Sequence, residues 1–349
     1  AENKEQWNKL SLIDCNVKAE RLGWLPSAPQ LNENPLDIAK QASSANKPVA
    51  EYVIEKLKSG DLNMACEDPD EPKNFPRNMF VWRSNLLGAS GKGHEYFMKY
   101  MLGTKNGIQG KDLGEAGGQK PSEVKWHEKA PTGKLDLLVT LDFRMSTTAL
   151  YSDIVLPTAS WYEKNDLNTS DMHPFIHPLS AAIDPVWESR SDWDIYKSIA
   201  KKFSQLSVKH LGVEEDVVLV PIQHDTAKEL AQTHAVKDWK KGECEAIPGK
   251  TMPSIVTVKR DYPNTYAKFT AIGPLLEKLG NGGKGISWNT EHEVEQLREI
   301  NHTVTDKNSI AYGMPKIETD IEAAEMILSL APETNGEVAV KSWSALSKK

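Results

Sequence analysis

Two short apolar segments constrain the fold of this chain more than any other feature of its sequence. Residues 135–141 read LDLLVTL, and residues 153–156 read DIVL. A nearly continuous apolar run of this length is typical of a strand in a parallel sheet that is covered on both faces. The intervening RMSTTALYS is long enough for one or two helical turns. The pair therefore predicts two neighbouring parallel strands joined by a short helical crossover.

A third strand and two helices complete the predicted unit. Residues 79–82 are the apolar core of NMFVWRSN, and a glycine-rich turn, GASGKG, and an amphipathic segment, HEYFMKYMLG, follow it. Ser191 and Asp194 stand at the spacing of a helix capping box, ahead of a helix with one apolar face. We therefore predict an α/β unit with a parallel sheet over residues 76–205.

The segments on either side of this unit are less regular, and we expect irregular α+β structure there. Residues 1–75 combine short helical patterns with proline-containing connectors, which is typical of the end of a preceding domain followed by a connector. Residues 206–349 contain predicted strands at 217–220 and 255–258 and a predicted amphipathic helix over 321–330 that starts at Thr319 or Asp320. Their overall architecture cannot be read from the sequence.

Composition excludes several classes of protein. The 349 residues are enough for two to three domains, and 39% hydrophobic with 26% charged residues is a globular composition. A net charge of −7 without a dense Lys/Arg block lacks the footprint of a nucleic-acid-binding protein. Charged residues interrupt every apolar run, so we expect no membrane span, and any link to a membrane must come through a partner. Three widely spaced cysteines form no CxxC pair, which indicates neither a zinc site nor a disulfide framework and fits a reducing compartment.

The two ends of the chain resemble cuts through a longer polypeptide. The sequence opens AENKEQWNKL, without Met and without the regions of a signal peptide, and it closes at SALSKK inside a helical pattern. We therefore expect an internal fragment of a larger subunit.

Polar side chains gather where the predicted strands end. The first strand leads to Ser84 and Asn85, the second ends at Asp142, and the third leads to Glu163 and Lys164. Ligands of open α/β sheets bind beyond the carboxyl ends of the strands, where an acidic residue can accept from a ribose hydroxyl or a guanine edge and a lysine can pair with phosphate. Any one of these residues alone is more often a cap or turn residue, but the set predicts a nucleotide-like ligand.

The glycine-rich turn GASGKG has two interpretations. A turn between a strand and a helix can cradle an anion on its backbone N–H groups, and Arg83, Ser84 and Asn85 sit at the same strand end. The turn is not a Walker A loop, because Leu86 and Gly93 occupy positions that the motif reserves for other residues. A tight turn without a ligand stays the alternative.

A second cluster lies in DMHPFIH, where Asp171, His173 and His177 stand close together. Pro174 and Pro178 exclude a regular helix that would present both imidazoles on one face, and no further ligand is evident, so a protein-held metal is disfavoured. The functional role left to the two histidines is that of hydrogen-bond donors near a ligand. No nucleophile and base pair stands out elsewhere.

The segment DIVLPT followed by W-x-E-K resembles the signature of the molybdopterin oxidoreductases, the dimethyl sulfoxide reductase superfamily. Longer segments, among them VWRSNLLGASGKGHEYFMKYMLGT and LNTSDMHPFIHPLSAAIDPVWESRSDWDIYKSIAKKFS, resemble the catalytic alpha subunits of membrane-bound respiratory nitrate reductases. The likeness extends over essentially the whole chain.

This resemblance implies that residues 76–205 form a molybdopterin guanine dinucleotide-binding α/β domain, with residues 206–349 as a subunit-specific extension and a following helical segment. A molybdenum atom would be held by two molybdopterin guanine dinucleotides, and the polar tail after the third strand would line the groove for one of them. By motif position, the implied cofactor-binding residues are Asn85, Leu141, Asp142, Lys164 and Asp192. Weaker candidates are Ser84, Ser90, His173 and His177.

The resemblance also implies an activity and partners. The activity would be reduction of nitrate to nitrite by oxygen-atom transfer at the molybdenum centre, as part of anaerobic respiratory electron transport. The partners would be an iron–sulfur beta subunit and a membrane cytochrome b gamma subunit, which would hold the chain at the cytoplasmic face of the membrane as a peripheral protein. A 4Fe–4S cluster and the molybdenum ligand would be bound by residues outside this chain, so the fragment alone should be inactive.

Three alternatives remain open. Another oxyanion reductase of the superfamily, acting on chlorate, selenate or perchlorate, would share these motifs. A non-catalytic module that holds an ordinary guanine nucleotide would also use polar strand ends. The region beyond residue 205 could be an interaction surface for the iron–sulfur subunit, with aromatic anchors, although core packing is the commoner role of such residues; they are Trp239, Tyr262, Tyr266 and Trp288.

Overall fold

A computed structural model of the chain describes residues 11–24, 30–89, 93–94, 96–105, 120–125, 127, 129–222, 236–283 and 286–347. The described residues form two compact units, each built from separate stretches of the sequence. Unit 1 comprises those in Ala1–Met79, Leu87–Leu138 and Glu214–Arg260, and unit 2 those in Phe80–Leu86, Val139–Val213 and Asp261–Lys349. The predicted division at 75/76 and 205/206 stays a prediction, because a compact unit and a family domain need not share boundaries.

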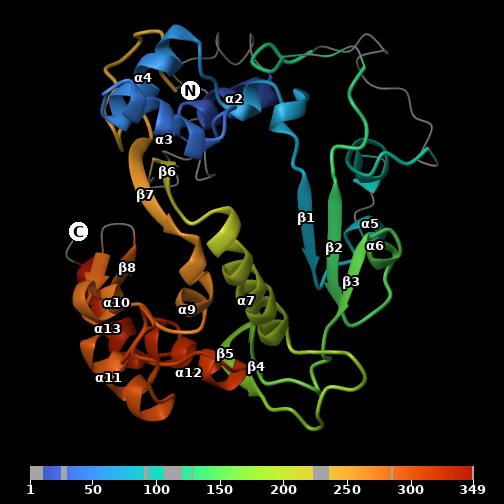
Figure 1. Ribbon diagram of the computed structural model, residues 1–349, viewed down its shortest axis with the longest axis vertical. Helices are drawn as coiled ribbons and strands as arrows, with labels where there is room; N and C mark the ends of the chain where they lie inside the picture. Colours follow the sequence, from blue (N-terminus) through green and yellow to red (C-terminus); the bar gives the residue numbers. More distant parts are fainter. Residues whose placement is uncertain are drawn as a thin grey trace. The chain divides into compact units, whose positions relative to one another are not determined.

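The three predicted strands form one sheet (Figure 1). β1 spans Asn78–Trp82, β2 spans Leu137–Asp142 and β3 spans Ile154–Pro157, in the order β1-β2-β3. β2 and β3 are parallel, with Leu141 opposite Leu156. β1 runs in the same direction, because hydrogen bonds join its two ends to successive parts of β2. The prediction of a parallel sheet is confirmed, and the carboxyl ends of its strands lie at one edge.

The central strand is buried along nearly its whole length. All residues from Leu138 to Asp142 are buried, which explains the continuous apolar run in the sequence. The strand begins two residues later than predicted, because the amide of Leu135 donates to the carbonyl of Met101 rather than to a neighbouring strand. The predicted crossover is a short helix, α6 (Thr147–Leu150), whose first turn is capped by the Ser146 hydroxyl.

The described part of the segment HEYFMKYMLG forms a helix, but not an ordinary α-helix. Its regular part, η3 (Tyr96–Met101), is a π-helix, and the amide of Leu102 donates to the carbonyl of Phe97, five residues earlier. Gly103 follows with a φ of +72° and ends the element, as its position in the sequence predicts.

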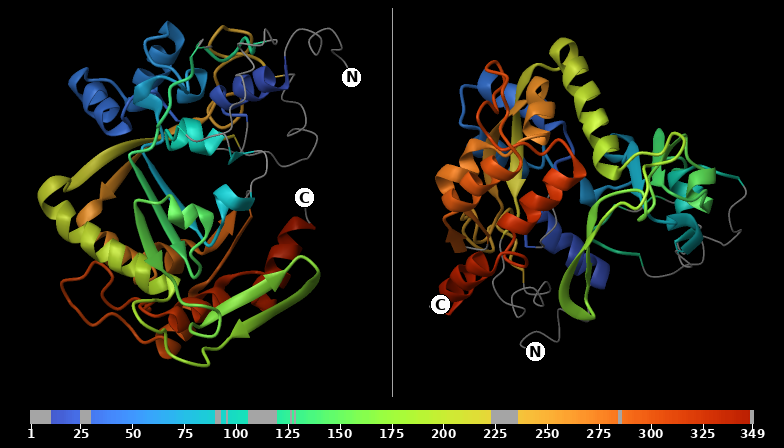
Figure 2. Two further views of the ribbon diagram at one scale, coloured as in Figure 1. Left: turned by 90° about the vertical axis from the view of Figure 1, so that its right-hand side faces the viewer. Right: turned by 90° about the horizontal axis from the view of Figure 1, so that it is seen from below.

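The polar tail after β3 folds into a hairpin (Figure 2). β4 spans Asp166–Ser170 and β5 spans His173–Leu179, and the two strands pair antiparallel with Asn168 opposite His177. The register shifts between Asn168 and Ser170. These strands were not predicted, because β4 is mostly polar and β5 contains two prolines, which are uncommon inside strands.

α7 (Asp192–His210) closes the α/β part of unit 2. Its cap, Ser191, accepts a hydrogen bond from the amide of Asp194 at 3.1 Å. The predicted capping box is only half formed, because the Asp194 carboxylate accepts from the Ser191 hydroxyl instead of the backbone N–H. α7 packs against η5 (Tyr262–Asn264) and α9 (Thr265–Phe269) within the same unit.

The rest of unit 2 is mainly helical. Its elements are α10 (Pro274–Leu279), the hairpin strands β8 (Asn281–Gly283) and β9 (Ile286–Trp288), α11 (Glu291–Ile300), α12 (Asp320–Leu330) and α13 (Gly336–Leu346). Their shared core contains Ile272, Val294, Leu297, Met314 and Leu330. α12 starts at a full capping box formed by Thr319 and Glu322, which confirms the predicted start of this helix.

Unit 1 has its own core beneath helices at the N-terminal end of the described chain. Its elements are α2 (Leu12–Arg21), α3 (Pro35–Ser44), α4 (Val49–Ser59), the 3₁₀ turns η1 (Ala65–Glu67) and η2 (Pro72–Asn74), and most of the paired strands β6 (Val213–Val220) and β7 (Ser254–Asp261). The four-residue helix α5 (Leu86–Ala89) follows β1 in the sequence. Trp239 is 1% exposed inside this core, so the alternative that made it a surface anchor is wrong. Among the described helices, none combines the length and the apolar character that crossing a membrane requires.

Candidate functional site

Arg83 occupies the position where β1 ends, and its backbone is unusual there. Its φ is +52°, a left-handed conformation that only a few per cent of non-glycine residues adopt. Its guanidinium pairs with both carboxylate oxygens of Asp192, with Nε at 2.9 Å from Oδ1 and Nη2 at 2.6 Å from Oδ2. Nη2 also donates to the carbonyl of Ala159 at 2.8 Å. Arg83 therefore joins the strand end to the start of α7 and to the loop after β3.

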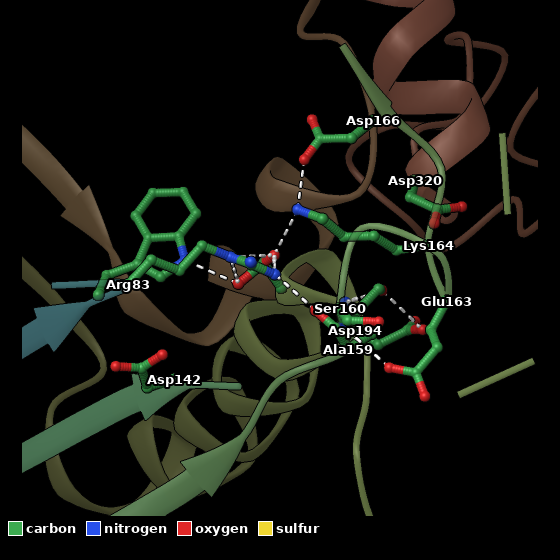
Figure 3. A network of polar contacts seen from close by, with 12 residues as sticks. Arg83, Asp142, Ala159, Ser160, Glu163, Lys164, Asp166, Asp194 and Asp320 are labelled. Atoms are coloured by element: carbon green, nitrogen blue, oxygen red, sulfur yellow. Dashed lines mark hydrogen bonds and ion pairs between the residues drawn. The ribbon is translucent and has the colours of Figure 1, made fainter. Parts of the chain in front are cut away.

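Asp192 lies at the centre of this network, and Figure 3 labels its neighbours Arg83, Lys164 and Asp166. Besides Arg83, the Nε1 of Trp82 donates to its Oδ1 at 2.7 Å, and the Nζ of Lys164 donates to its Oδ2 at 2.9 Å. An ionised carboxylate offers about four acceptor positions, so these donors nearly saturate it. Burial tends to raise the pKa of Asp192, but the hydrogen bonds from Arg83, Lys164 and Trp82 outweigh it and hold this pKa below its ordinary value.

Lys164 is the second buried cation of the network. Its side chain is 5% exposed, and its ammonium contacts the carboxylates of Asp192 and Asp166. A lysine ammonium has three N–H donors, so these two ion pairs leave one donor for another acceptor. Arg83 and Lys164 thus approach Asp192 from different elements and share its Oδ2 atom.

A cavity of about 370 Å³ adjoins the network within unit 2, in the size range of small-ligand pockets. Its wall combines aromatic rings, carboxylates and small apolar side chains of α12. The lining includes Trp82, Lys164, Asp166, Asp192, Trp193, Tyr196, Phe269, Asp320, Ala323 and Ile327. Such a wall can hold a flat group that also forms hydrogen bonds.

The loop that carries Lys164 is held on both sides. Glu163 accepts a hydrogen bond from the amide of Ser160 at 2.8 Å, and this bond lowers the pKa of the Glu163 carboxyl. On the other side, the amide of Asn165 donates to Oδ2 of Asp320 at 3.0 Å. These contacts fix the backbone of the loop before and after the lysine.

Three other predicted residues support the sheet edge locally. The side-chain oxygen of Asn85 accepts from the amide of Thr148 at 3.3 Å and so holds the start of α6. The Asp142 carboxylate accepts from the amide of Arg144 at 3.2 Å, and the buried Leu141 accepts through its carbonyl from the amide of Arg83 at 2.8 Å. In Figure 3, no contact joins Asp142 to the other residues drawn.

The structure therefore brings Lys164 and Asp192 into direct contact and leaves the remaining candidates apart from this pair. Ser84 is exposed beside Arg83. His173 and His177 are exposed on β5, with ring centroids 5.3 Å apart. Ser90 lies outside the described residues, as does much of the GASGKG turn, so the anion-cradle interpretation stays a prediction. No group of three or more His, Cys, Asp or Glu side chains in the described ranges could hold a metal ion.

The partners that organise this site were not predicted from the sequence. Arg83 was associated only with the glycine-rich turn, yet it pairs with Asp192, 109 positions away. Asp320 reaches Asn165 across 155 positions. The sequence feature that could have indicated the pairing of Arg83 is its position directly after a buried strand. A charged residue at such a position needs a partner of opposite charge near the sheet edge.

Comparison with known proteins agrees with the resemblance seen in the sequence. Residues 2–202 match the molybdopterin oxidoreductase family, and residues 279–349 match domain V of the nitrate reductase alpha chain. The chain is 64% identical to the respiratory nitrate reductase 1 alpha chain of Escherichia coli (strain K12) over 97% of its own length and 27% of that protein. It is 52% identical to the nitrate reductase alpha chain of Bacillus subtilis (strain 168) over 95% of its length, again 27% of that protein.

A further relative has another substrate in its name. The chain is 52% identical to the perchlorate reductase subunit alpha of Dechloromonas aromatica (strain RCB) over 48% of its length and 14% of that protein. The chain spans about a quarter of the length of the nitrate reductase alpha chains that it matches, 27% in each case.

Proposed function

Because the chain belongs to the molybdopterin oxidoreductase family, we propose that it is part of the catalytic subunit of a respiratory nitrate reductase, which reduces nitrate to nitrite. The observation that carries this proposal is the buried pair of Lys164 and Asp192 at the carboxyl edge of the parallel sheet, where sheets of this class bind their ligands. The high identity to nitrate reductase alpha chains supports the choice of substrate.

The family implies a molybdenum–molybdopterin cofactor, and we propose its bis(guanine dinucleotide) form. The donors at the sheet edge fit such a group. Within the described residues, the buried ammonium of Lys164 retains one N–H donor beyond its two ion pairs. Phosphate and ring carbonyl oxygens are acceptors for donors of this kind.

The residues that would hold the cofactor are those that motif position indicates, with the strand-end polar groups first. They are Asn85, Leu141, Asp142, Lys164 and Asp192, the last acting through Lys164, followed by Ser84, Ser90, His173 and His177. The adjoining cavity supports a place for a purine ring, because Trp82 and Tyr196 offer aromatic faces beside the carboxylates of Asp166 and Asp320.

The cofactor, when bound, supplies the oxygen-atom transfer, and the protein supplies binding, orientation and electrostatics. Asp192 holds Lys164 in one position through its Oδ2 atom. Asp142 and Asn85 fix the backbone at the ends of β2 and β1, so the strand edge stays rigid. The buried setting strengthens each of these polar contacts, because water does not compete for them.

The partners and location follow from the same proposal. Alpha chains of respiratory nitrate reductases imply a complex of several subunits. We infer an iron–sulfur beta subunit and a cytochrome b gamma subunit that holds the complex at the cytoplasmic face of the membrane. A 4Fe–4S cluster would be bound elsewhere in the complete alpha subunit.

The similarity to a perchlorate reductase subunit favours one other substrate class, the chlorine oxyanions. The test is purification of the complete complex, followed by measurement of molybdenum and guanine nucleotide per subunit and turnover of nitrate, perchlorate, chlorate and selenate with a reduced viologen dye. We expect stoichiometric molybdenum and the highest kcat/KM for nitrate. A complex without molybdenum overturns the proposal, and a preference for perchlorate moves it to the other substrate. A non-catalytic guanine nucleotide module would instead show saturable GDP binding by the isolated chain.

A further inference from the structure

We propose that Arg83 is a positioning residue, which fixes Asp192 and through it the ammonium of Lys164 at the wall of the cofactor site. This inference rests on the proposed function, because Lys164 matters here as a cofactor-binding residue.

Two neighbouring side chains, those of Trp82 and Arg83, point to the same carboxylate. Consecutive residues of a strand point to opposite faces of a sheet. Trp82 and Arg83 are consecutive, yet both donate to Oδ1 of Asp192, at 2.7 and 2.9 Å. The left-handed backbone of Arg83, with φ at +52°, lets the strand end present both donors to one carboxylate. Non-glycine residues in this region are strained and cluster at functional sites.

The guanidinium of Arg83 makes a set of contacts that depends on its planar shape. Arg83 contacts both oxygens of Asp192 and the carbonyl of Ala159, and its guanidinium carbon lies 5.6 Å from the ring centre of Phe143. Only a planar fork can satisfy a bidentate carboxylate, a carbonyl and an aromatic face together. The compact ammonium of a lysine cannot reproduce this set of contacts.

The carboxylate of Asp192 already accepts hydrogen bonds from three side chains. Its carboxylate is nearly saturated by Trp82, Arg83 and Lys164, so it has little capacity left to accept from a bound ligand. Its function in this arrangement is to hold Lys164, and the two Arg83 bonds prevent the carboxylate from rotating away. The donor directed at the cofactor is therefore the remaining N–H of Lys164.

The alternative is that the Arg83 pair only stabilises the fold. Both readings predict a less stable subunit when Arg83 is replaced. They differ in how the replacement combines with a change of Lys164, because a residue that acts through Lys164 has no further effect once Lys164 is lost.

The test uses the complete complex with single Arg83→Met, Arg83→Lys and Lys164→Met substitutions and the double Arg83→Met/Lys164→Met variant. The control is Arg77→Gln. Arg77 is an exposed arginine directly before β1, and the substitution breaks its ion pair with Asp136. The readouts are molybdenum per subunit, guanine nucleotide released by acid hydrolysis, and the rate at which the cofactor is lost in mild denaturant.

We expect both Arg83 variants to lose cofactor about 10- to 100-fold faster than the wild type, the range seen when groups that orient metal ligands are removed. The double variant should lose it no faster than Lys164→Met alone, and Arg77→Gln should match the wild type. If Arg83→Met does not accumulate, Arg83→Lys decides, because it keeps a cation at this position.

Wild-type retention by Arg83→Lys, or multiplied effects in the double variant, overturns the inference while leaving the proposed function intact. A wild-type complex that contains neither molybdenum nor guanine nucleotide overturns the proposed function instead. The two failures are therefore distinguishable in one set of measurements.

Discussion

Asp320 accepts two hydrogen bonds from Asn165, one from its backbone amide at 3.0 Å and one from its side-chain amide at 3.4 Å. Asn165 directly follows Lys164, and Asp320 is the first residue of α12. The contact ties the part of the chain that matches domain V, residues 279–349, to the loop that carries the buried lysine. The family-specific extension thus supports the sheet edge directly.

Replacing Asp320 with Ala should loosen this loop. A hydrogen bond to a charged group contributes about 1.5–3 kcal/mol, so the amide of Asn165 should exchange with deuterium about 10- to 100-fold faster. Mass spectrometry of a peptide that covers residues 163–168 in the complete subunit measures this rate. Asp306→Ala is a matched control, because that carboxylate accepts from the nearby amide of Asn308 and no contact of the described residues joins it to the loop. Equal exchange in both variants would show that α12 does not hold the loop.

The low pKa of Asp192 predicts how its contribution to stability depends on pH. Although burial tends to raise this pKa, the bonds from Arg83, Lys164 and Trp82 hold it below the ordinary value of 3.8. A carboxyl group whose pKa is lower in the folded than in the unfolded state stabilises the folded state at pH values above its unfolded pKa. This stabilisation is lost as the pH falls through the folded pKa. Asp192→Asn should therefore lower the free energy of unfolding by about 3–5 kcal/mol near neutral pH. The loss should be smaller at pH values below the ordinary pKa of an aspartate carboxyl group.

Thermal unfolding of the complete subunit across this pH range measures the effect. Asp194→Asn is the control, because that carboxylate lies in the same first turn of α7 and is 48% exposed. A difference between wild type and Asp192→Asn that stays constant down to strongly acidic pH would contradict the assignment of this carboxylate as ionised.

Local sequence patterns predicted the elements of the sheet but not the partners across it. The apolar run before Asp142 indicates a strand that is buried on both faces, and the polar residues after each strand indicate where its carboxyl end lies. Both are properties of a few neighbouring residues. Lys164 was predicted from the strand-end pattern and Asp192 only from motif position within the family resemblance, and the structure places the two side chains in contact.

What could not be predicted depends on distant contacts or on fine backbone geometry. The pairing of Arg83 with Asp192 joins positions 109 apart. The hairpin of β4 and β5 pairs DLNTS with HPFIHPL, and neither segment shows the regular apolar alternation of a typical strand. The π-helix at Tyr96–Met101 differs from an α-helix by one residue per hydrogen-bonded turn, which apolar spacing over so few residues cannot resolve.

Leu141 should contribute strongly to stability, because its side chain is 0% exposed in the central strand. Leu141→Ala should cost about 2–5 kcal/mol, the sum of the lost burial and the cavity left behind. Leu150→Ala is the control, because Leu150 in α6 is 70% exposed. The thermal midpoint of the complete subunit measures both, and a similar small shift for the two variants would mean that the sheet is not a packed core.

Cys66 should react slowly with alkylating agents. Burial, together with the nearby Glu20 and Glu67, raises the pKa of this thiol to about 12 from an ordinary value of 9.0. Between about pH 8 and pH 10, the thiolate fraction of such a group rises about 100-fold, whereas that of an ordinary thiol rises about tenfold. Iodoacetamide labelling followed by peptide mapping measures the rate at each pH. A tenfold rise would show that Cys66 is an ordinary exposed thiol.

Gly103 should not tolerate a side chain. Its φ of +72° is unfavourable for alanine, and an added Cβ would lie 3.0 Å from the Cα of Gly133. Gly103→Ala should therefore cost at least about 1–2 kcal/mol, the penalty of a left-handed backbone for a residue with a Cβ. Gly336→Ala is the control, because Gly336 begins α13 with open space around its Cα, and alanine there should be neutral or stabilising by about 0.5–1 kcal/mol. The thermal midpoints of the two variants should move in opposite directions or by clearly different amounts, and equal losses would mean that backbone conformation does not decide the residue at position 103.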